Sequence, residues 1–242
     1  MQKGNPGSST TTKGIGDYVT DVDRASEQAI SALLSGERPD IPILGEEAGG
    51  TTGPRYWTVD PLDGTTNYLH GFPIVGVSIC LIEGGRPSVG VVHAPFLGET
   101  YSGARDLGAN LDRGDGRPER LRVSSRSPHH AVVGTGFPFR SKHRLPRYLT
   151  AFESALERFE DLRRPGAASL DLAWVAAGVF DGFFELGLSS WDVAAGALLV
   201  EEAGGTVSDW SGGGDYLAGD NLAGPTDVHA ILLEIGRESA TS

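Results

Sequence analysis

The chain has 242 residues, enough for one large domain or for two closely packed lobes. Hydrophobic residues make up 39% of it and charged residues 21%, proportions typical of a globular protein and not of a disordered one. The formal net charge of -12 argues against broad, non-specific binding to nucleic acid, which needs clustered Lys and Arg against the phosphates. A small phosphorylated substrate is not excluded, because carboxylates that hold divalent cations present positive charge locally once the metal is bound.

Three features of the chain bear on its compartment. Cys80 is the only cysteine and lies in an apolar run, so a disulfide framework is impossible and a thiolate metal site is not expected. The first 14 residues are polar and carry no apolar core of the kind that a secretory signal requires. No apolar stretch approaches the roughly 18 residues that indicate a membrane span. We therefore expect a cytoplasmic protein with no membrane partner.

The first half of the chain predicts one helix followed by short strands. Residues 1–12 are polar and predict a flexible lead-in, and residues 22–34 carry apolar side chains at helical spacing. Short runs rich in β-branched residues predict strands, with Gly84-Gly85 as a hairpin turn. These strands cover residues 41–44, 56–59, 75–82 and 88–93. Further antiparallel pieces are expected near Tyr101 and Gly103 and at residues 107–109 and 121–123.

The composition changes at a polar stretch over residues 124–128, so we place a lobe boundary near residue 127. Beyond it the pattern predicts strands at 131–135 and 182–185 and helices at 145–159, 168–177, 192–203 and 226–235. The expected fold class is a layered α/β (α+β) sandwich of alternating helices and sheets. An antiparallel N-terminal lobe would cover residues 13–127 and a mixed C-terminal lobe residues 128–242, with the functional site between them.

The most informative segment is Asp60-Pro61-Leu62-Asp63-Gly64-Thr65-Thr66-Asn67. A buried strand delivers Asp60, and Pro61 prevents a regular ladder from continuing, so we expect the chain to turn there. A tight turn brings both aspartates to one side, where the Leu62 carbonyl adds a neutral oxygen. Hard oxygen donors of this kind suit magnesium far better than zinc. Gly64-Thr65-Thr66 would then open a helix whose N–H groups hold a phosphate. Taken alone, the segment is equally consistent with an Asp-rich turn that only caps backbone N–H groups.

Two other acidic segments favour the metal interpretation. Gly45-Glu46-Glu47 follows the strand at 41–44, and Trp191-Asp192-Val193-Ala194-Ala195-Gly196 places an acid at the start of a helix. In this order, with the segment from Asp60 to Tyr68 between them, they resemble the signature of the inositol monophosphatase family. The resemblance runs from about Lys13 to the last helix and includes residues 19–23 and 134–138. Family members usually carry a long helix before the segment at Lys13, where this chain has the polar lead-in.

The resemblance implies a layered αβαβα fold of the inositol monophosphatase and fructose-1,6-bisphosphatase type. It implies that Glu46, Asp60 and the Leu62 carbonyl hold a first magnesium ion. Asp60, Asp63 and Asp192 would hold a second, and a weaker third ion would lie near Glu46.

The same resemblance assigns the remaining site residues. Glu46 and a pair formed by Thr65 and Asp23 would orient the attacking water. The N–H groups of Gly64 and Thr65 would bind the phosphate. The alcohol part of the substrate would contact the four residues Gly166, Ala168, Glu185 and Asp192. For Glu185 a simple edge-strand charge is the competing interpretation, and the basic stretch Arg140-Ser141-Lys142-His143-Arg144 is interpreted as a solvated loop.

We therefore expect a magnesium-dependent, lithium-sensitive phosphoric monoester hydrolase that forms a homodimer and acts on a small phosphorylated polyol or sugar. Inositol monophosphate is the leading substrate, and fructose 1,6-bisphosphate and histidinol phosphate stay open. No nucleic-acid partner is expected. A function of a different class also stays open, that of a regulatory protein-binding module that retains the phosphatase fold, although the intact set of acids argues against lost catalysis.

Overall fold

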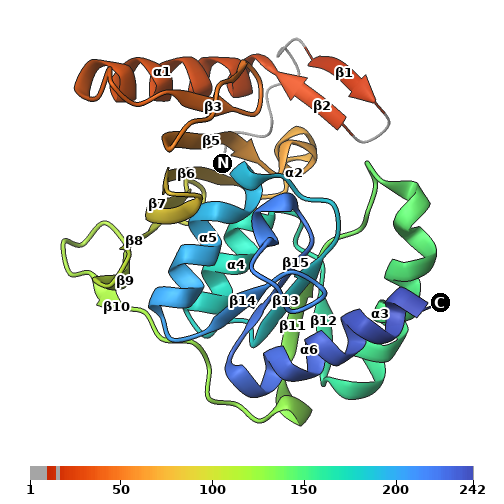
Figure 1. The fold of residues 1–242 in the computed structure, drawn as a ribbon. Coiled ribbons are helices and arrows are strands. Elements are labelled where there is room, and N and C mark those ends of the chain that lie inside the picture. The colour runs from red at the N-terminus through yellow and green to blue at the C-terminus, as the bar shows by residue number, and fades with distance from the viewer. Residues whose placement is uncertain (1–9, 15–16, 242) are drawn as a thin grey trace.

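The structure is a computed structural model that describes residues 10–14 and 17–241. In this part of the chain, two large β-sheets and the main helices stack in five layers (Figure 1). Helix α1 (Asp21–Glu37) covers the larger sheet, and helices α4 (Ala168–Ala176) and α5 (Ser190–Glu202) lie between the two sheets. Helices α3 (Leu145–Arg158) and α6 (Thr226–Glu238) cover the smaller sheet. This order of layers agrees with the αβαβα sandwich predicted from the sequence.

The larger sheet has eight strands among the described residues, in the order β10-β9-β8-β7-β6-β5-β3-β4. Its pairs are antiparallel except for β3 and β5, which run parallel. Gly84 and Gly85, with φ of 60° and 77°, form the turn between β6 and β7, as predicted. The strands are β3 (Ile43–Gly45), β4 (Gly49–Gly50), β5 (Arg55–Asp63), β6 (Gly76–Glu83), β7 (Arg86–Ala94), β8 (Glu99–Ala104), β9 (Gly108–Asp112) and β10 (Glu119–Arg120).

The smaller sheet is mixed and has five strands among the described residues, in the order β12-β11-β13-β15-β14. Strand β11 runs parallel to both of its neighbours, and β15 runs antiparallel to its own. The strands are β11 (Val132–Thr135), β12 (Asp161–Arg163), β13 (Gly182–Glu185), β14 (Thr206–Ser208) and β15 (Asn221–Gly224).

Shorter elements complete the described chain. Strands β1 (Thr10–Gly14) and β2 (Asp17–Thr20) pair with each other, and helix α2 (Thr65–His70) directly follows β5. Four 3-10 helices cover Pro128–His130, Lys142–Arg144, Tyr216–Ala218 and Ser239–Thr241. None of the described helices is long and apolar enough to cross a membrane.

The sequence-based elements differ from the structure at a few points. Most of the predicted lead-in lies outside the described residues, but residues 10–12 belong to β1. The piece expected at residues 121–123 is wrong, because β10 ends at Arg120. The sequence analysis does not predict strands β12, β14 and β15, since each spans only three or four residues, too few for a strand period to stand out.

The two middle helices are buried between the sheets, and their composition follows from that position. Helix α5 buries nine consecutive residues from Asp192 to Val200, and α4 buries nearly all of its side chains. Small alanines let the helices approach both sheets closely, and one hydrophobic cluster runs from Cys80 in the larger sheet to Phe183 in the smaller one. A second cluster fills the space under α3 and α6. Because the first cluster contains residues from both sides of residue 127, these contacts do not divide the chain there, and the lobe boundary stays a prediction.

The close packing of α4 against α5 predicts that a larger residue at Gly196 destabilises the protein. A Cβ atom at Gly196 would lie 2.5 Å from Leu172 Cβ, whereas one at Gly36 in α1 would meet nothing within 4 Å. We expect Gly196→Ala to lower the free energy of unfolding by about 1–3 kcal/mol, as overpacking does. The matched variant Gly36→Ala should leave stability equal or slightly higher, because alanine favours helix. Urea unfolding of both variants checks this, and equal effects would contradict it.

Candidate active site

A cleft of ≈ 450 Å³ collects most of the residues that the sequence analysis selected. Its walls come from the end of β5, the start of α2, the loop after β11, the loop before α4, the end of β13 and the start of α5. The sequence-predicted residues that line it are Glu46, Asp60, Leu62, Asp63, Gly64, Thr65, Gly166, Ala168, Glu185 and Asp192. Acids that are up to 146 positions apart in the sequence thus face one space.

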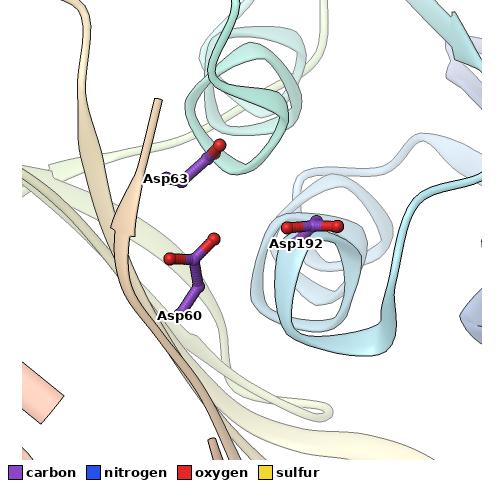
Figure 2. A group of neighbouring side chains, drawn as sticks. All are labelled: Asp60, Asp63 and Asp192. Carbon is purple, nitrogen blue, oxygen red and sulfur yellow. The ribbon is translucent and has the colours of Figure 1, made fainter. Parts of the chain in front are cut away.

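Three aspartates converge most closely in this cleft. One carboxylate oxygen each from Asp60, Asp63 and Asp192 lies within 4.8 Å of the others, and this is the acidic group with metal-ligand spacing found among the described residues. Figure 2 shows Asp60 and Asp63 on one strand segment and Asp192 across from them at the start of a helix. Asp60 is buried and Asp63 half-buried, so solvent screens their charges poorly.

Strand β5 presents the first two acids through an irregularity rather than a turn. Asp60 pairs with Ser78 and Asp63 with Gly76, so three steps along β5 match two steps along β6. This is a β-bulge, and Pro61 lies within it, where its missing N–H costs no ladder hydrogen bond. The Leu62 N–H donates to Asp60 Oδ1 at 2.9 Å. The expectation that β5 ends in a turn at Pro61 is therefore wrong, since the strand continues to Asp63.

Asp192 is fixed by the first turn of α5. Its carboxylate Oδ2 accepts a hydrogen bond from the Ser189 N–H at 2.7 Å, and the Asp192 N–H lies in the first turn of the same helix. Such a reciprocal cap at once starts the helix and orients the acid. Ser78 Oγ on β6 donates to the Trp191 carbonyl at 2.8 Å, which ties this helix start to the larger sheet.

Glu46 reaches the cleft from the turn after β3, and this turn is held by a residue that sequence analysis missed. The buried Glu27 of α1 accepts hydrogen bonds from the Glu47 and Ala48 N–H groups at 2.8 and 2.7 Å. A glutamate on the inner face of an amphipathic helix was the available signal, because such a residue is seldom buried without partners. Arg140 lies 3.5 Å from Glu46 Oε1.

Thr65 and Asp23 are brought together, as the family resemblance implied. Thr65 Oγ1 lies 3.1 Å from Asp23 Oδ1 and 3.1 Å from the Leu62 carbonyl oxygen. Asp23 Oδ2 accepts from the Thr20 N–H at 2.8 Å, so the cap of α1 also fixes this carboxylate. Gly64 has a φ of 89°, a left-handed conformation that favours glycine, and it precedes α2.

Two side chains outside the predicted set hold the cleft walls together. Ser169 donates to Asp63 Oδ2 from both its N–H, at 2.7 Å, and its Oγ, at 2.6 Å. Asn67 Nδ2 donates to the Ile74 and Pro165 carbonyls at 2.7 and 2.9 Å, which joins α2 to the loop before α4. These contacts span about a hundred residues and leave no local pattern in the sequence.

Burial raises the pKa of every acid that lines the cleft, and repulsion by neighbouring carboxylates adds to this for all of them except Asp192. Loss of solvation is the largest cause and raises the pKa of Glu46 to about 7 and that of Asp63 to about 7. The same effect raises the pKa of Asp60 well above its ordinary value, with repulsion from Glu46 next, and raises that of Asp192. An all-oxygen donor set with excess negative charge fits a hard divalent cation such as magnesium.

The opposite wall of the cleft combines a buried acid with basic side chains. Glu185 at the end of β13 packs against Gly136, where any side chain would collide with its carboxylate. Burial, followed by repulsion from Asp192, raises the pKa of Glu185 to about 8. Arg140 and Lys142 line the cleft, and Arg144 pairs with Asp220. Arg140, Lys142 and His143 are exposed, as a solvated loop requires, and the stretch in addition borders the cleft.

The fold and site together define an α/β protein of five layers with an acidic cleft suited to a divalent cation. A model of the inositol monophosphatase family matches residues 2–239, and the chain belongs to that family. It is 48% identical over 234 residues to the Nus factor SuhB of Pseudomonas aeruginosa, covering 93% of this chain and 84% of that protein. It is 44% identical over 227 residues to the inositol-1-monophosphatase of Mesorhizobium japonicum, covering 92% and 84%.

Solved structures of the family share the fold. The extragenic suppressor protein suhB of Bartonella henselae superposes with a TM-score of 0.89 at 38% identity, over 96% of this chain and 89% of that one. The Thermotoga maritima IMPase superposes with a TM-score of 0.85 at 33% identity, over the same shares. The predicted family and fold class are confirmed.

The raised pKa of Glu185 predicts how stability depends on pH in protein without divalent cations. Because the pKa rises from 4.5 to about 8 on folding, the folded state binds the extra proton and loses stability as the pH rises through that window. Glu185→Gln removes the cost of ionising this buried carboxyl. At pH 8 we therefore expect the free energy of unfolding of the variant to exceed that of the wild type by about 1 kcal/mol or more. Thermal unfolding at pH 5 and pH 8 measures the difference.

Glu157→Gln, on the exposed face of α3, is the matched control and should follow the wild type at both pH values. The other cleft acids contribute the same pH dependence to both proteins, so equal changes in stability between pH 5 and pH 8 for wild type and Glu185→Gln would contradict the raised pKa of Glu185.

Proposed function

We propose that the protein hydrolyses a phosphate monoester of a polyol or sugar in the presence of magnesium, with inositol monophosphate as the leading substrate. The observation that carries this proposal is the convergence of Asp60, Asp63 and Asp192 within 4.8 Å in a cleft that Glu46 also lines. Membership of the family and similarity to an inositol-1-monophosphatase support it.

The metal ligands in this proposal are those named from the sequence. Glu46, Asp60 and the Leu62 carbonyl would hold one ion, and Asp60, Asp63 and Asp192 a second, so that Asp60 serves both. When bound, magnesium supplies positive charge for the phosphate oxygens and makes water more acidic. Ser169 would keep Asp63 oriented for this task through its two hydrogen bonds.

The water and the phosphate would be positioned beside the start of α2. Thr65 Oγ1 donates to Asp23, which leaves its lone pair to accept a hydrogen bond from the attacking water. As the new oxygen–phosphorus bond forms, the water proton passes to Thr65 and the threonine proton to Asp23. The ester bond breaks, and the leaving alcohol oxygen would take up a proton from a solvent water molecule. N–H groups of Gly64 and Thr65 would hold the phosphate oxygens.

The alcohol part of the substrate would lie toward the opposite wall. Glu185 and Asp192 would accept hydrogen bonds from its hydroxyl groups, and the small residues Gly166 and Ala168 leave room for a ring. A neutral Glu185, which its raised pKa favours near pH 7, would instead donate one hydrogen bond.

A phosphate-release assay tests the proposal directly. Wild-type protein with magnesium is offered inositol 1-phosphate, fructose 1,6-bisphosphate and histidinol phosphate, and release from inositol 1-phosphate is expected to be fastest. Chelation of the metal should stop release, and lithium should inhibit it. No release from any of the three esters would contradict an enzymatic function.

Removal of one carboxylate from the shared ligand gives a second prediction. Asp60→Asn keeps the side-chain volume but weakens both proposed metal sites, so turnover should fall by at least about 100-fold while the circular dichroism spectrum stays unchanged. Asp40→Asn, at an exposed acid that pairs with Arg38, is the control and should retain full turnover. Comparable turnover in both variants would contradict the proposed role of Asp60 as a metal ligand.

A regulatory function is the second candidate, since relatives from Pseudomonas aeruginosa and Pasteurella multocida are named Nus factors. Expression of wild type and Asp60→Asn in P. aeruginosa that lacks its relative separates the two functions. Equal complementation by both would favour a binding role of the fold, and complementation by wild type alone would favour hydrolysis. The expected homodimer and the expected lack of a nucleic-acid partner stay predictions.

A further inference from the structure

Arg140 reaches from one wall of the cleft to an acid on the opposite wall. Its loop follows β11 of the smaller sheet, whereas Glu46 comes from the turn after β3 of the larger sheet. Arg140 Nη2 lies 3.5 Å from Glu46 Oε1, and both residues line the cleft. Because Glu46 is proposed above as a ligand of the first magnesium ion, a positive charge of the protein itself lies beside that metal site.

The first end of the Arg140 loop is held by contacts with aromatic rings. The Arg164 guanidinium carbon lies 5.3 Å from the ring centroid of Phe137 and 5.1 Å from that of Phe139. The two rings contact each other edge to face, with centroids 5.6 Å apart. Cation–π attraction to both rings therefore fixes the chain immediately before Arg140.

The other end of the loop is held by an ion pair. Arg144 pairs with Asp220, and the Asp220 carboxylate also accepts a hydrogen bond from the Gly187 N–H at 3.1 Å. These contacts join the loop to the chain after β13 and to the chain before β15. A loop that is fixed on both sides has little conformational entropy left to lose, so holding Arg140 across the cleft costs little.

The acid of the pair is also held in place. Glu27 accepts hydrogen bonds from the Glu47 and Ala48 N–H groups, which fixes the turn that carries Glu46. The Glu46 side chain is 12% exposed and that of Arg140 is 49% exposed. Because little water surrounds the Glu46 carboxylate, a nearby positive charge stabilises it more than it would stabilise a surface acid.

The charge of Arg140 also acts on acids beyond Glu46. Burial raises the pKa of Glu46, Glu185 and Asp192, and attraction to Arg140 works against this rise in each of the three. Arg140 thus stabilises the ionised form of these acids, as a bound cation would. A guanidinium and a dication that share one carboxylate repel each other, so the binding of either weakens the binding of the other.

We propose that Arg140 sets the magnesium affinity of the protein by competing with the ion for Glu46. Magnesium binding breaks the contact that Arg140 makes across the cleft, and this contact in turn weakens the first metal site. The proposal rests on the proposed magnesium-dependent function and adds a means of regulating its metal site. Arg140 is a positioning residue in this scheme, because it acts on a metal ligand and not on the reacting atoms.

Magnesium titration of charge variants tests the competition. Titration calorimetry without substrate should show that Arg140→Gln lowers the Kd for magnesium by roughly 3- to 10-fold, because the ion no longer has to displace a guanidinium. Arg140→Lys, which keeps the charge, should restore part of the wild-type Kd. Lys142→Gln is the matched control: it removes a positive charge that lines the same cleft but leaves the pair of Arg140 and Glu46 in place, so it should change the Kd much less.

Thermal unfolding assigns the effect to Glu46. In EDTA, Arg140→Gln should melt at a lower temperature than wild type, because the ion pair is lost. The same substitution should have a much smaller effect in Glu46→Gln protein, where the pair is already absent. At saturating magnesium the difference between Arg140→Gln and wild type should disappear, because the ion has then displaced Arg140 in the wild type as well.

Three results would overturn the proposal. An equal fall in Kd for Arg140→Gln and Lys142→Gln would make the effect one of overall charge. An undiminished effect of Arg140→Gln in the Glu46→Gln background would separate Arg140 from Glu46, and a wild-type melting temperature that magnesium does not change would leave no ion to compete. If wild type bound magnesium but hydrolysed no ester, the proposed function would fail, and the titration and unfolding measurements would still decide the role of Arg140.

Discussion

Repulsion among carboxylates that share one poorly solvated space is the constraint on which the site depends. Asp60, Asp63 and Asp192 come within 4.8 Å of one another, and burial raises the pKa of each. Folding opposes this repulsion with backbone devices: the β5 bulge, the cap of α5 and the hydrogen bonds of Ser169. A divalent cation would relieve the repulsion, so the features that weaken the ion-free protein are those that suit it to bind metal.

The packing of the layers fixes the positions of these hydrogen-bonding groups relative to one another. Helices α4 and α5 bring Ser169 and Asp192 to the end of β5, and both are buried against the two sheets through one hydrophobic cluster. Since residues 192–200 of α5 are buried on all sides, the helix cannot shift without disturbing its packing against both sheets. A change at Gly196, one helical turn from Asp192, is therefore expected to disturb the position of Asp192 as well as the packing.

Much of this arrangement follows from local sequence, and the remainder follows from contacts that local sequence does not encode. Periodicity predicts α1, α3 and α6, and glycine pairs predict the β6–β7 turn. The order of acidic motifs, read through the family resemblance, identifies the residues that meet in the cleft. Glu27 and Ser169 escape this reasoning because their roles depend on hydrogen-bond partners distant in the chain. Pro61 misleads it, since a proline between two acids indicates a turn but is equally at home in a bulge.

The bulge in β5 also determines which face of the strand Asp60 and Asp63 point to. In a regular strand, residues separated by three positions project from opposite faces, so Asp60 and Asp63 would point apart. The one additional residue that β5 carries between them, relative to β6, returns both to the same face. Without the bulge, a regular ladder over the same four residues would keep both aspartates in the sequence and send one of them away from the cleft. The convergence of these acids thus depends on the backbone bulge as well as on the residue types, and a search for acids alone would overlook the loss of that bulge.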